Sequence, residues 1–191
     1  MTLNTEEMKR QKRTMSIVII YQIVLILLSF ALNLFVFEVH PFAATLPSKE
    51  LFQALIIATV LLVLNHTWLM TATELTRARF KMHSTPEEWA ASGTNREDAS
   101  KEGISELERH HSTHQNTTEN VVYFALLALI FAFSSPPTIV ATVWLVGFAV
   151  ARLGYTYSYL YGKDNPRGLF MSLSLLAMYG LASYLVISLI S

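Results

Sequence analysis

The densest run of chemically reactive side chains in this sequence is the segment 106–120, which continues without glycine or proline into the apolar segment 121–133. Four side chains share one helical face there, at i, i+3, i+4 and i+7 spacing: Asn116, Glu119, Asn120 and Tyr123. This face puts a carboxylate and two amides at the depth where water gives way to hydrocarbon. Such groups tend to face the interior of a bundle and mark a site. They also fit a solvated helix end whose amides join neighbouring helices.

A second constellation lies inside an apolar run, where Arg152, Tyr155, Thr156 and Tyr159 also follow i, i+3, i+4 and i+7 spacing. A guanidinium within the bilayer needs an acidic or anionic partner, because an unpaired buried charge is costly. One interpretation is a structural ion pair between Arg152 and Glu119. The other is a polar pocket for an anionic small molecule with Arg167 at its mouth, where a cation would favour a thiolate.

The histidines offer a third kind of chemistry. His110 and His114 stand at i, i+4 and fit a two-histidine metal clamp on one helix face. Apart from Glu106, one turn earlier, no further ligand is clearly placed. We therefore expect no metal site, and we expect His110 and His111 to be solvated.

Composition identifies the elements that must position these residues. The chain has 191 residues, of which 52% are apolar and 15% charged, and its formal net charge is zero. Neutrality gives no electrostatic argument for a nucleic-acid partner. The sequence contains no cysteine, which excludes disulfides and cysteine-based sites. The apolar residues are concentrated in long blocks, so the sequence predicts an all-α integral membrane protein.

Five apolar runs are long enough to cross a hydrocarbon core of ~30 Å as helices. After a polar segment at 1–13, residues 14–37 predict a retained helix, because the run exceeds the apolar core of a signal peptide and no cleavage site follows. Four further helices are predicted at about 51–80, 109–133, 138–161 and 169–190. Segment 81–108 is predicted to be a loop containing a helix start at 85–88. The polar pair Asn65 and His66 fits either helix packing or ligand binding.

Basic residues predict the orientation of these helices. The N-terminus carries four Lys or Arg residues, segment 74–116 carries six and segment 162–168 carries two, whereas the opposite side has only Lys49. By the positive-inside rule, the N-terminus and the segment 81–116 are cytoplasmic. The C-terminus then lies outside or in a lumen, in a bacterial inner membrane or an endoplasmic reticulum.

Several pieces of sequence, taken in order over roughly residues 66–185, resemble one known family. They are Leu69-Met70-Thr71-Ala72-Thr73 with Leu75-Thr76-Arg77 and Phe80; Pro86-Glu87-Glu88; Glu108-Arg109, His114, Asn116 and Glu119-Asn120; Arg152, Thr156, Tyr159 and Leu160; and Pro166 with Arg167. The family is the membrane-associated proteins in eicosanoid and glutathione metabolism (MAPEG), and the closest branch resembles the microsomal glutathione transferases and prostaglandin E synthases.

The resemblance implies a homotrimer of four-helix protomers, formed here by residues 48–191, with the helix at 14–37 as an addition. Glutathione would be the co-substrate, held between subunits near the cytoplasmic face. The residues that the resemblance assigns to glutathione binding are Arg109, His114, Asn116, Glu119, Asn120, Arg152 and Tyr159. Arg167 would be catalytic and stabilise the thiolate. The implied enzyme is a detoxification-type transferase or peroxidase that attacks apolar electrophiles or lipid hydroperoxides arriving from the bilayer.

The sequence also departs from the family pattern. The departures are Glu74, Ser112, Gln115 and Thr117 in the first half of the motif, and Tyr155, Gly168 and Met171 in the second. Several of them replace cations, and each charge-assisted hydrogen bond contributes roughly 1.5–3 kcal/mol. These losses weaken the expected anchoring of glutathione carboxylates. A non-catalytic lipid-binding or scaffold protein on the same helical frame is therefore the alternative function.

Overall fold

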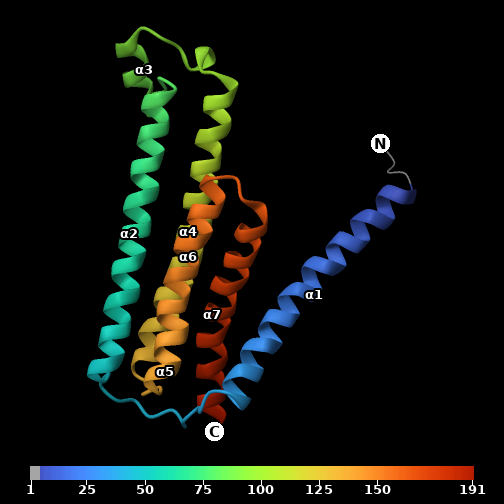
Figure 1. The fold of residues 1–191 in the computed structure, drawn as a ribbon, viewed down its shortest axis with the longest axis vertical. Helices are drawn as coiled ribbons and strands as arrows, with labels where there is room; N and C mark the ends of the chain where they lie inside the picture. Colours follow the sequence, from blue (N-terminus) through green and yellow to red (C-terminus); the bar gives the residue numbers. More distant parts are fainter. Residues whose placement is uncertain (1–4) are drawn as a thin grey trace.

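A computed structural model describes residues 5–191, so positions 1–4 of the predicted polar segment 1–13 lie outside the described range. Throughout that range the chain forms helices and loops, with no β-strand, which confirms the all-α fold class. The long elements are α1 (Thr5–Phe35), α2 (Lys49–Arg79), α4 (Lys101–Ala132), the continuous segment α5 (Thr138–Ala141), η2 (Thr142–Val146) and α6 (Gly147–Leu160), and α7 (Asp164–Ile190). Figure 1 shows α2, α4, α6 and α7 side by side, with α1 set at an angle against α7.

Within residues 5–191, four helices are long and apolar enough to cross a membrane: Glu6–Phe35, Lys49–Arg79, Thr138–Leu160 and Asp164–Ile190. The protein is therefore an integral membrane protein. Helix α4, which contains the helix predicted at about 109–133, does not meet this measure. The reason is that the polar run 101–120 occupies more than half of the helix. Five spans were predicted, and four are supported by length and composition.

The helices extend beyond the apolar runs that predicted them. The helix expected at 14–37 already includes Thr5, and the one expected from 109 begins at Lys101, because the Ser100 hydroxyl accepts a hydrogen bond from the Gly103 amide at 3.0 Å. The loop expected at 81–108 is therefore shorter and contains α3 (Pro86–Ser92) and the 3-10 turn η1 (Arg96–Asp98). The predicted helix start at 85–88 is confirmed. Hydropathy marks the membrane-embedded part of a helix and misses its extension into water.

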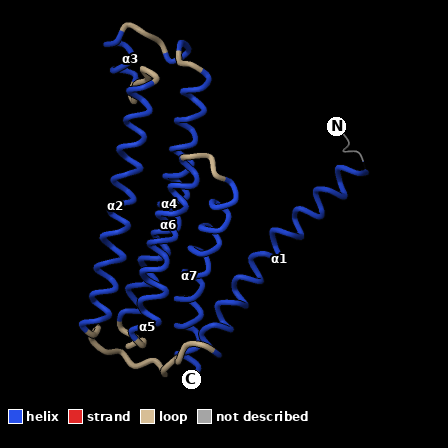
Figure 2. The backbone as a smooth tube through the Cα atoms, in the orientation of Figure 1, coloured by secondary structure: helices blue, strands red, loops and turns tan. Residues whose placement is uncertain are grey.

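Connections alternate between the two ends of the bundle (Figure 2). The α2–α4 connection and the α6–α7 turn lie on the same side of the bundle, with α2 and α4 extending well beyond the α6–α7 turn. We call the part of the bundle at the α6–α7 turn the basic end, because Lys163 and Arg167 lie in or next to this turn and Arg109 of α4 approaches it. The α1–α2 connection, the α4–α5 turn and the C-terminus lie at the opposite end. This arrangement fits the topology expected from the basic residues. Which end faces the cytoplasm stays a prediction.

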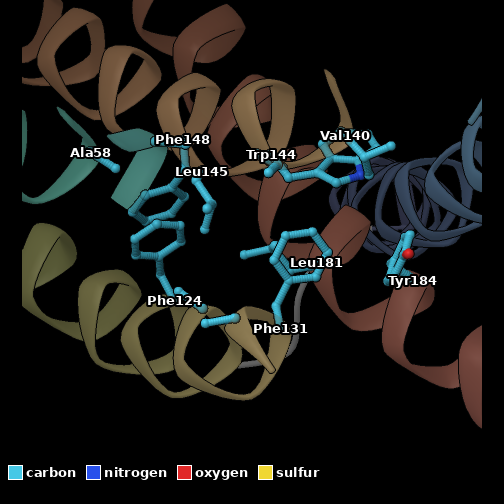
Figure 3. Packing of buried hydrophobic residues seen from close by; sticks show 14 of the residues in the cluster. Ala58, Phe124, Phe131, Val140, Trp144, Leu145, Phe148, Leu181 and Tyr184 are labelled. Carbon is cyan, nitrogen blue, oxygen red and sulfur yellow. The ribbon is translucent and has the colours of Figure 1, made fainter. Parts of the chain in front are cut away.

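The hydrophobic core lies in the half of the bundle away from the basic end. Figure 3 shows its side chains from close by. The Phe124 ring of α4 stacks on the Phe148 ring of α6 with centroids 4.0 Å apart, and Phe131 meets Tyr184 edge to face at 5.0 Å. Small residues of α2, such as Ala54 and Ala58, let that helix approach closely. This packing fixes the rotation of α4 and α6, and so decides which of their polar side chains point inward.

Helix α1 is held against the bundle by a buried polar group that we call the Asn33 network: Asn33, Trp144, Gly180 and Ser183. The Asn33 amide nitrogen donates to the Gly180 carbonyl and the Ser183 hydroxyl, both at 2.8 Å. Its amide oxygen accepts from the Trp144 indole at 3.1 Å. Nearer the basic end, Tyr21 bonds Ser172 at 2.8 Å. In hydrocarbon such bonds join helices specifically, since water does not compete for them.

The segment from Thr138 to Leu160 is not a regular α-helix throughout. Element η2 is a π-helical turn, with the wider i to i+5 pattern. Trp144, inside this turn, reaches out to α1, whereas Phe148, just after it, packs on α4. The wide turn therefore lets one helix direct side chains toward two neighbouring helices.

Candidate functional site

Arg152 is the most deeply buried cation of the described chain, with no exposed surface. Its Nη2 donates to the Asn116 Oδ1 at 3.0 Å and to the Thr117 hydroxyl at 2.7 Å, and its guanidinium lies 4.3 Å from the centre of the Tyr155 ring. Within residues 5–191 no carboxylate pairs with it, and its Nε has no hydrogen-bond partner. Its Nη1 also donates to the Met171 sulfur at 3.8 Å. Neutral acceptors and a ring face therefore compensate this buried charge, and no anion within residues 5–191 does.

Aromatic rings connect this buried cation to an open one. The Tyr155 and Tyr159 ring centroids are 5.6 Å apart, and the Arg167 guanidinium lies 5.1 Å from the centre of the Tyr159 ring. We call Arg152, Tyr155, Tyr159 and Arg167 the arginine–tyrosine chain. The Arg167 side chain is 41% exposed and pairs with Asp164 at 3.1 Å. The chain thus runs from the bundle interior to the surface at the basic end.

Local backbone geometry brings together α6 and α7, the two helices that carry the arginine–tyrosine chain. Gly162, at the turn between α6 and α7, has a φ of +63°, which favours glycine. A Cβ at that position would lie 3.0 Å from the Arg109 Nη1, so Arg109 of α4 also approaches the turn. Arg109 pairs with Glu106 at 3.4 Å. Three helices therefore contribute Arg109, Arg152 and Arg167 around the basic end of the bundle.

The predicted polar face of α4 is divided by the packing. Asn120 is buried, and its amide nitrogen donates to the Asn116 backbone carbonyl at 2.8 Å. The half-buried Asn116 side chain points inward, since its Oδ1 accepts from Arg152. Glu119 is exposed and accepts from Gln115 at 3.0 Å. Because Thr117 points inward, Glu119, two residues on, is turned away by about 200°. The predicted Arg152–Glu119 ion pair is therefore not formed within the chain.

The histidines separate rather than converge. His110 is buried against the Thr76 hydroxyl at 3.2 Å, so the expectation that it is solvated is wrong. The His114 ring meets the His66 ring edge to face, with centroids 5.8 Å apart. Burial lowers the pKa of His110, and burial together with the neighbouring His66 and His111 lowers the pKa of His114. No group of three metal-ligating side chains occurs within residues 5–191.

Sequence reasoning missed two features of this region. Thr117 supplies the shortest hydrogen bond to Arg152, although its only signal was that it stands where the family pattern has Asp. An apolar groove of about 800 Å³ runs between α2 and α4, from Leu46 and Phe133 at one end to His66 and Thr117 at the other. The groove depends on how two helices diverge, and spacing within either helix does not reveal that.

The fold and this site define a class: an integral membrane protein whose helix bundle gathers three arginines at one end, one of them buried. The chain belongs to the MAPEG family, whose model matches residues 55–187. It is similar to microsomal glutathione S-transferase 1 from Bos taurus, with 29% identity over 123 residues, which cover 63% of this chain and 79% of that protein. Helix α1 and its Asn33 precede the matched residues.

Proposed function

We propose that the protein is a membrane-bound glutathione transferase or peroxidase that activates glutathione as a thiolate for attack on apolar electrophiles or lipid hydroperoxides. The observation that carries this proposal is the arginine–tyrosine chain. It is a row of side-chain contacts that connects a solvent-exposed guanidinium to a buried one. Glutathione has two carboxylates and a thiol, so it suits a site rich in arginine. The family membership and the related glutathione transferase support the same ligand.

The roles of the residues follow from their positions. Arg167 is open to solvent and is the proposed catalytic cation, because a nearby positive charge lowers the pKa of a thiol. Arg109 lies at the same turn and suits a ligand carboxylate. Arg152 is enclosed and acts through Asn116, whose amide oxygen it holds. The remaining proposed binding residues present amide, imidazole, carboxylate or phenol groups at this end: His114, Glu119, Asn120 and Tyr159.

The outer face of α4 supports a homotrimer. Seven of its exposed side chains lie at alternating spacings of three and four, a pattern typical of helices that pair with other helices. They are Ser112, Gln115, Glu119, Val122, Leu126, Leu129 and Phe133, which we call the α4 seam. Gln115 and Glu119 are poorly suited to face lipid, so we propose that other copies of the chain cover the seam. The number three rests on the family resemblance.

We also propose that the basic end faces the cytoplasm, as the excess of Lys and Arg there predicts. The chain contains no cysteine. A single cysteine introduced at Lys163, or at Pro47 on the opposite side, can therefore be labelled from one side of intact vesicles. Labelling of the Lys163→Cys variant from the outer, non-cytoplasmic side would reverse the proposed orientation.

The function is tested by calorimetry and turnover on the purified full chain in detergent. We expect glutathione to bind at micromolar to low-millimolar concentration and 1-chloro-2,4-dinitrobenzene to be conjugated. Arg167→Ala should abolish most conjugation, Arg167→Lys should retain part of it, and Lys49→Ala, at the opposite end, should match the wild type. No binding at several millimolar glutathione would reject the proposal.

The groove between α2 and α4 favours the second candidate function, a non-catalytic lipid-binding or scaffold protein. Its lining is mostly apolar and it opens within the membrane-embedded part of the bundle. A lipid that co-purifies in stoichiometric amount, together with no glutathione binding, would support this function instead.

A further inference from the structure

A row of aromatic side chains lies on the outer side of α2 and α6, near the basic end. The centres of the Trp68 ring of α2 and the Tyr157 ring of α6 are 6.4 Å apart, and those of Tyr157 and Tyr161 are 4.9 Å apart. Tyr157 and Tyr161 are 43% and 62% exposed. Tyr157 stands two residues beyond Tyr155, so it is turned by about 200° on the helix, away from the arginine–tyrosine chain. These rings therefore take no part in the candidate site.

Lys163 adds a positive charge to this row. Its Nζ donates a hydrogen bond of 2.8 Å to the Tyr157 hydroxyl and lies 4.6 Å from the centre of the same ring. Within residues 5–191 no carboxylate pairs with Lys163. The Tyr157 oxygen accepts the bond from Lys163, so the phenol proton is available for another acceptor. An ammonium and a phenol thus offer donors side by side. We call these four residues the aromatic–lysine row: Trp68, Tyr157, Tyr161 and Lys163.

Next to the row, the same side of both helices is apolar and open. Leu64 and Ile57 precede Trp68 by four and eleven residues on α2, and Val150 precedes Tyr157 by seven residues on α6. At this spacing each lies on the side of its helix that carries the ring. Leu64 is 55% exposed, and Ile57 and Val150 are each 50% exposed. Since α2 and α6 both run toward the basic end, these three residues, which we call the apolar strip, lie nearer the middle of the membrane than the rings.

This surface is separate from the groove between α2 and α4. None of the residues of the aromatic–lysine row or the apolar strip lines that groove within the described chain. His66, which does line it, stands two residues before Trp68 on α2 and therefore points to the other side of the helix.

The row and the strip together have the polarity of an anionic phospholipid. Trp and Tyr are enriched at the level of the lipid headgroups, where an apolar ring meets a polar surface. A phosphodiester is an anion with several acceptor oxygens, so it complements the Lys163 ammonium and the Tyr157 hydroxyl. A headgroup with its own cation, such as choline, would bring a second positive charge beside Lys163. Phosphatidylglycerol has no such cation and therefore suits the row better than phosphatidylcholine.

We propose that the aromatic–lysine row binds one anionic phospholipid per protomer, taken from the leaflet at the basic end. The lipid phosphate accepts hydrogen bonds from Lys163 and Tyr157, the glycerol region lies against Trp68, and an acyl chain lies along the apolar strip. The inference does not depend on the proposed glutathione chemistry, since no residue of the candidate site contributes to this surface.

The experiment is native mass spectrometry of the full chain in detergent, titrated with phosphatidylglycerol and phosphatidylcholine that carry the same acyl chains. One basic side chain strengthens binding of an anionic lipid by about fivefold, and the phenol donor adds to this, so we expect phosphatidylglycerol to bind about tenfold more tightly. Lys163→Gln should lose about fivefold of this preference, and Tyr157→Phe, which keeps the ring, about twofold. Lys49→Gln is the matched control, at an exposed lysine of the opposite end that contacts no aromatic ring within residues 5–191.

Tryptophan fluorescence locates the bound lipid. Phosphatidylglycerol with brominated acyl chains should quench the protein's fluorescence more than brominated phosphatidylcholine does, and this difference should disappear in Trp68→Phe. Quenching that is unchanged in Trp68→Phe would place the lipid elsewhere and overturn the inference.

Three outcomes of the titration would also overturn the inference. Equal affinities for the two lipids would mean that the row is only an interfacial belt of aromatic residues. A preference that is unchanged in Lys163→Gln would mean that another surface selects the anionic lipid. Displacement of the lipid by millimolar inorganic phosphate would mean that the row recognises a free anion rather than a lipid of the membrane.

Discussion

The Asn33 network and the cluster around Arg152 are both buried polar groups in a membrane bundle, and they differ in how fully they are hydrogen-bonded. Both N–H donors of the Asn33 amide nitrogen, and the amide oxygen, have hydrogen-bond partners on two other helical segments. Around Arg152, the guanidinium has no acid partner within residues 5–191, and its Nε and the Thr156 hydroxyl have no hydrogen-bond partner there.

This contrast separates assembly from function. A complete network has nothing left to offer a ligand, so the Asn33 network serves to attach α1. An incompletely hydrogen-bonded cluster still has charge and donors available for a ligand, which is typical of sites that bind or react. Four experiments test whether the two clusters differ in this way.

Removing the buried charge should produce the largest effect. Arg152→Met takes away the group that holds Asn116, and we expect glutathione affinity to fall by about a hundredfold, which corresponds to about 2.8 kcal/mol. The melting temperature should stay unchanged or rise, because a buried cation without an acid partner is replaced by an apolar side chain. Calorimetry and thermal denaturation in detergent measure the two. A lower melting temperature with unchanged affinity would make Arg152 a structural residue.

A methyl group at Gly180 should disturb the complete network. A Cβ there would lie 2.5 Å from the Trp144 ring, so Gly180→Ala must displace the indole that bonds Asn33. Overpacking of this kind typically costs about 1–3 kcal/mol. We expect lower thermal stability and unchanged glutathione affinity. Gly147→Ala is the matched control, since nothing lies within 4 Å of its Cβ. If both variants melt alike, the contact of Trp144 with α7 contributes little.

Unlike the Asn33 network, the Arg152 cluster should become more stable when it is given a better hydrogen-bond acceptor. Thr117→Asp gives the guanidinium a carboxylate in place of a hydroxyl, and Thr117→Val removes the acceptor while keeping the shape. Hydrogen bonds between helices in membranes contribute about 1 kcal/mol, so we expect melting temperatures in the order Asp, Thr, Val. The carboxylate should also weaken glutathione binding by competing for the charge. A wild type more stable than both variants would show that the cluster is already complete.

The smallest expected effect is on pH dependence. The pKa of His110 is lowered by burial, so the unfolded chain binds its proton more readily than the folded one. Stability from this group is present above the unfolded pKa, near 6.5, and is lost as pH falls through that value toward the folded pKa. Thermal melts at pH 7.5 and 5.5 should therefore differ less in His110→Gln than in the wild type. An unchanged difference would mean that other groups cause the acid sensitivity.

Much of the frame was predictable because hydropathy and helical spacing are local properties. The spacing of Arg152, Tyr155 and Tyr159 predicted one face, and the structure joins these residues in one chain of contacts. Glu119 was expected inward and lies outside, because the direction of α4 is decided by the stacking of Phe124 on Phe148. Spacing tells which residues share a face, and only packing tells where that face points.

The attachment of α1 shows a second limit. Asn33 stands alone in an apolar run, and its partners lie more than a hundred positions away. Nothing in the run predicted them. The site residues that sequence reasoning assigned stay predictions where their roles toward a ligand are concerned. Their positions, with Arg109 and Arg167 at one turn, are compatible with those roles.

The π-helical turn at η2 has a consequence for how this chain tolerates insertions and deletions. A π-turn is an α-turn that has taken up one extra residue, so the residues after η2 keep the direction they would have in a regular helix one residue shorter. Deleting one residue between Thr142 and Val146 would therefore restore a regular helix and leave Arg152 facing α4. Deleting one residue between Gly147 and Ala151, in the regular part of the helix, would instead turn Arg152 by about 100° away from the site. The π-turn is thus the one stretch of this helix where losing a residue would keep the buried cation in place.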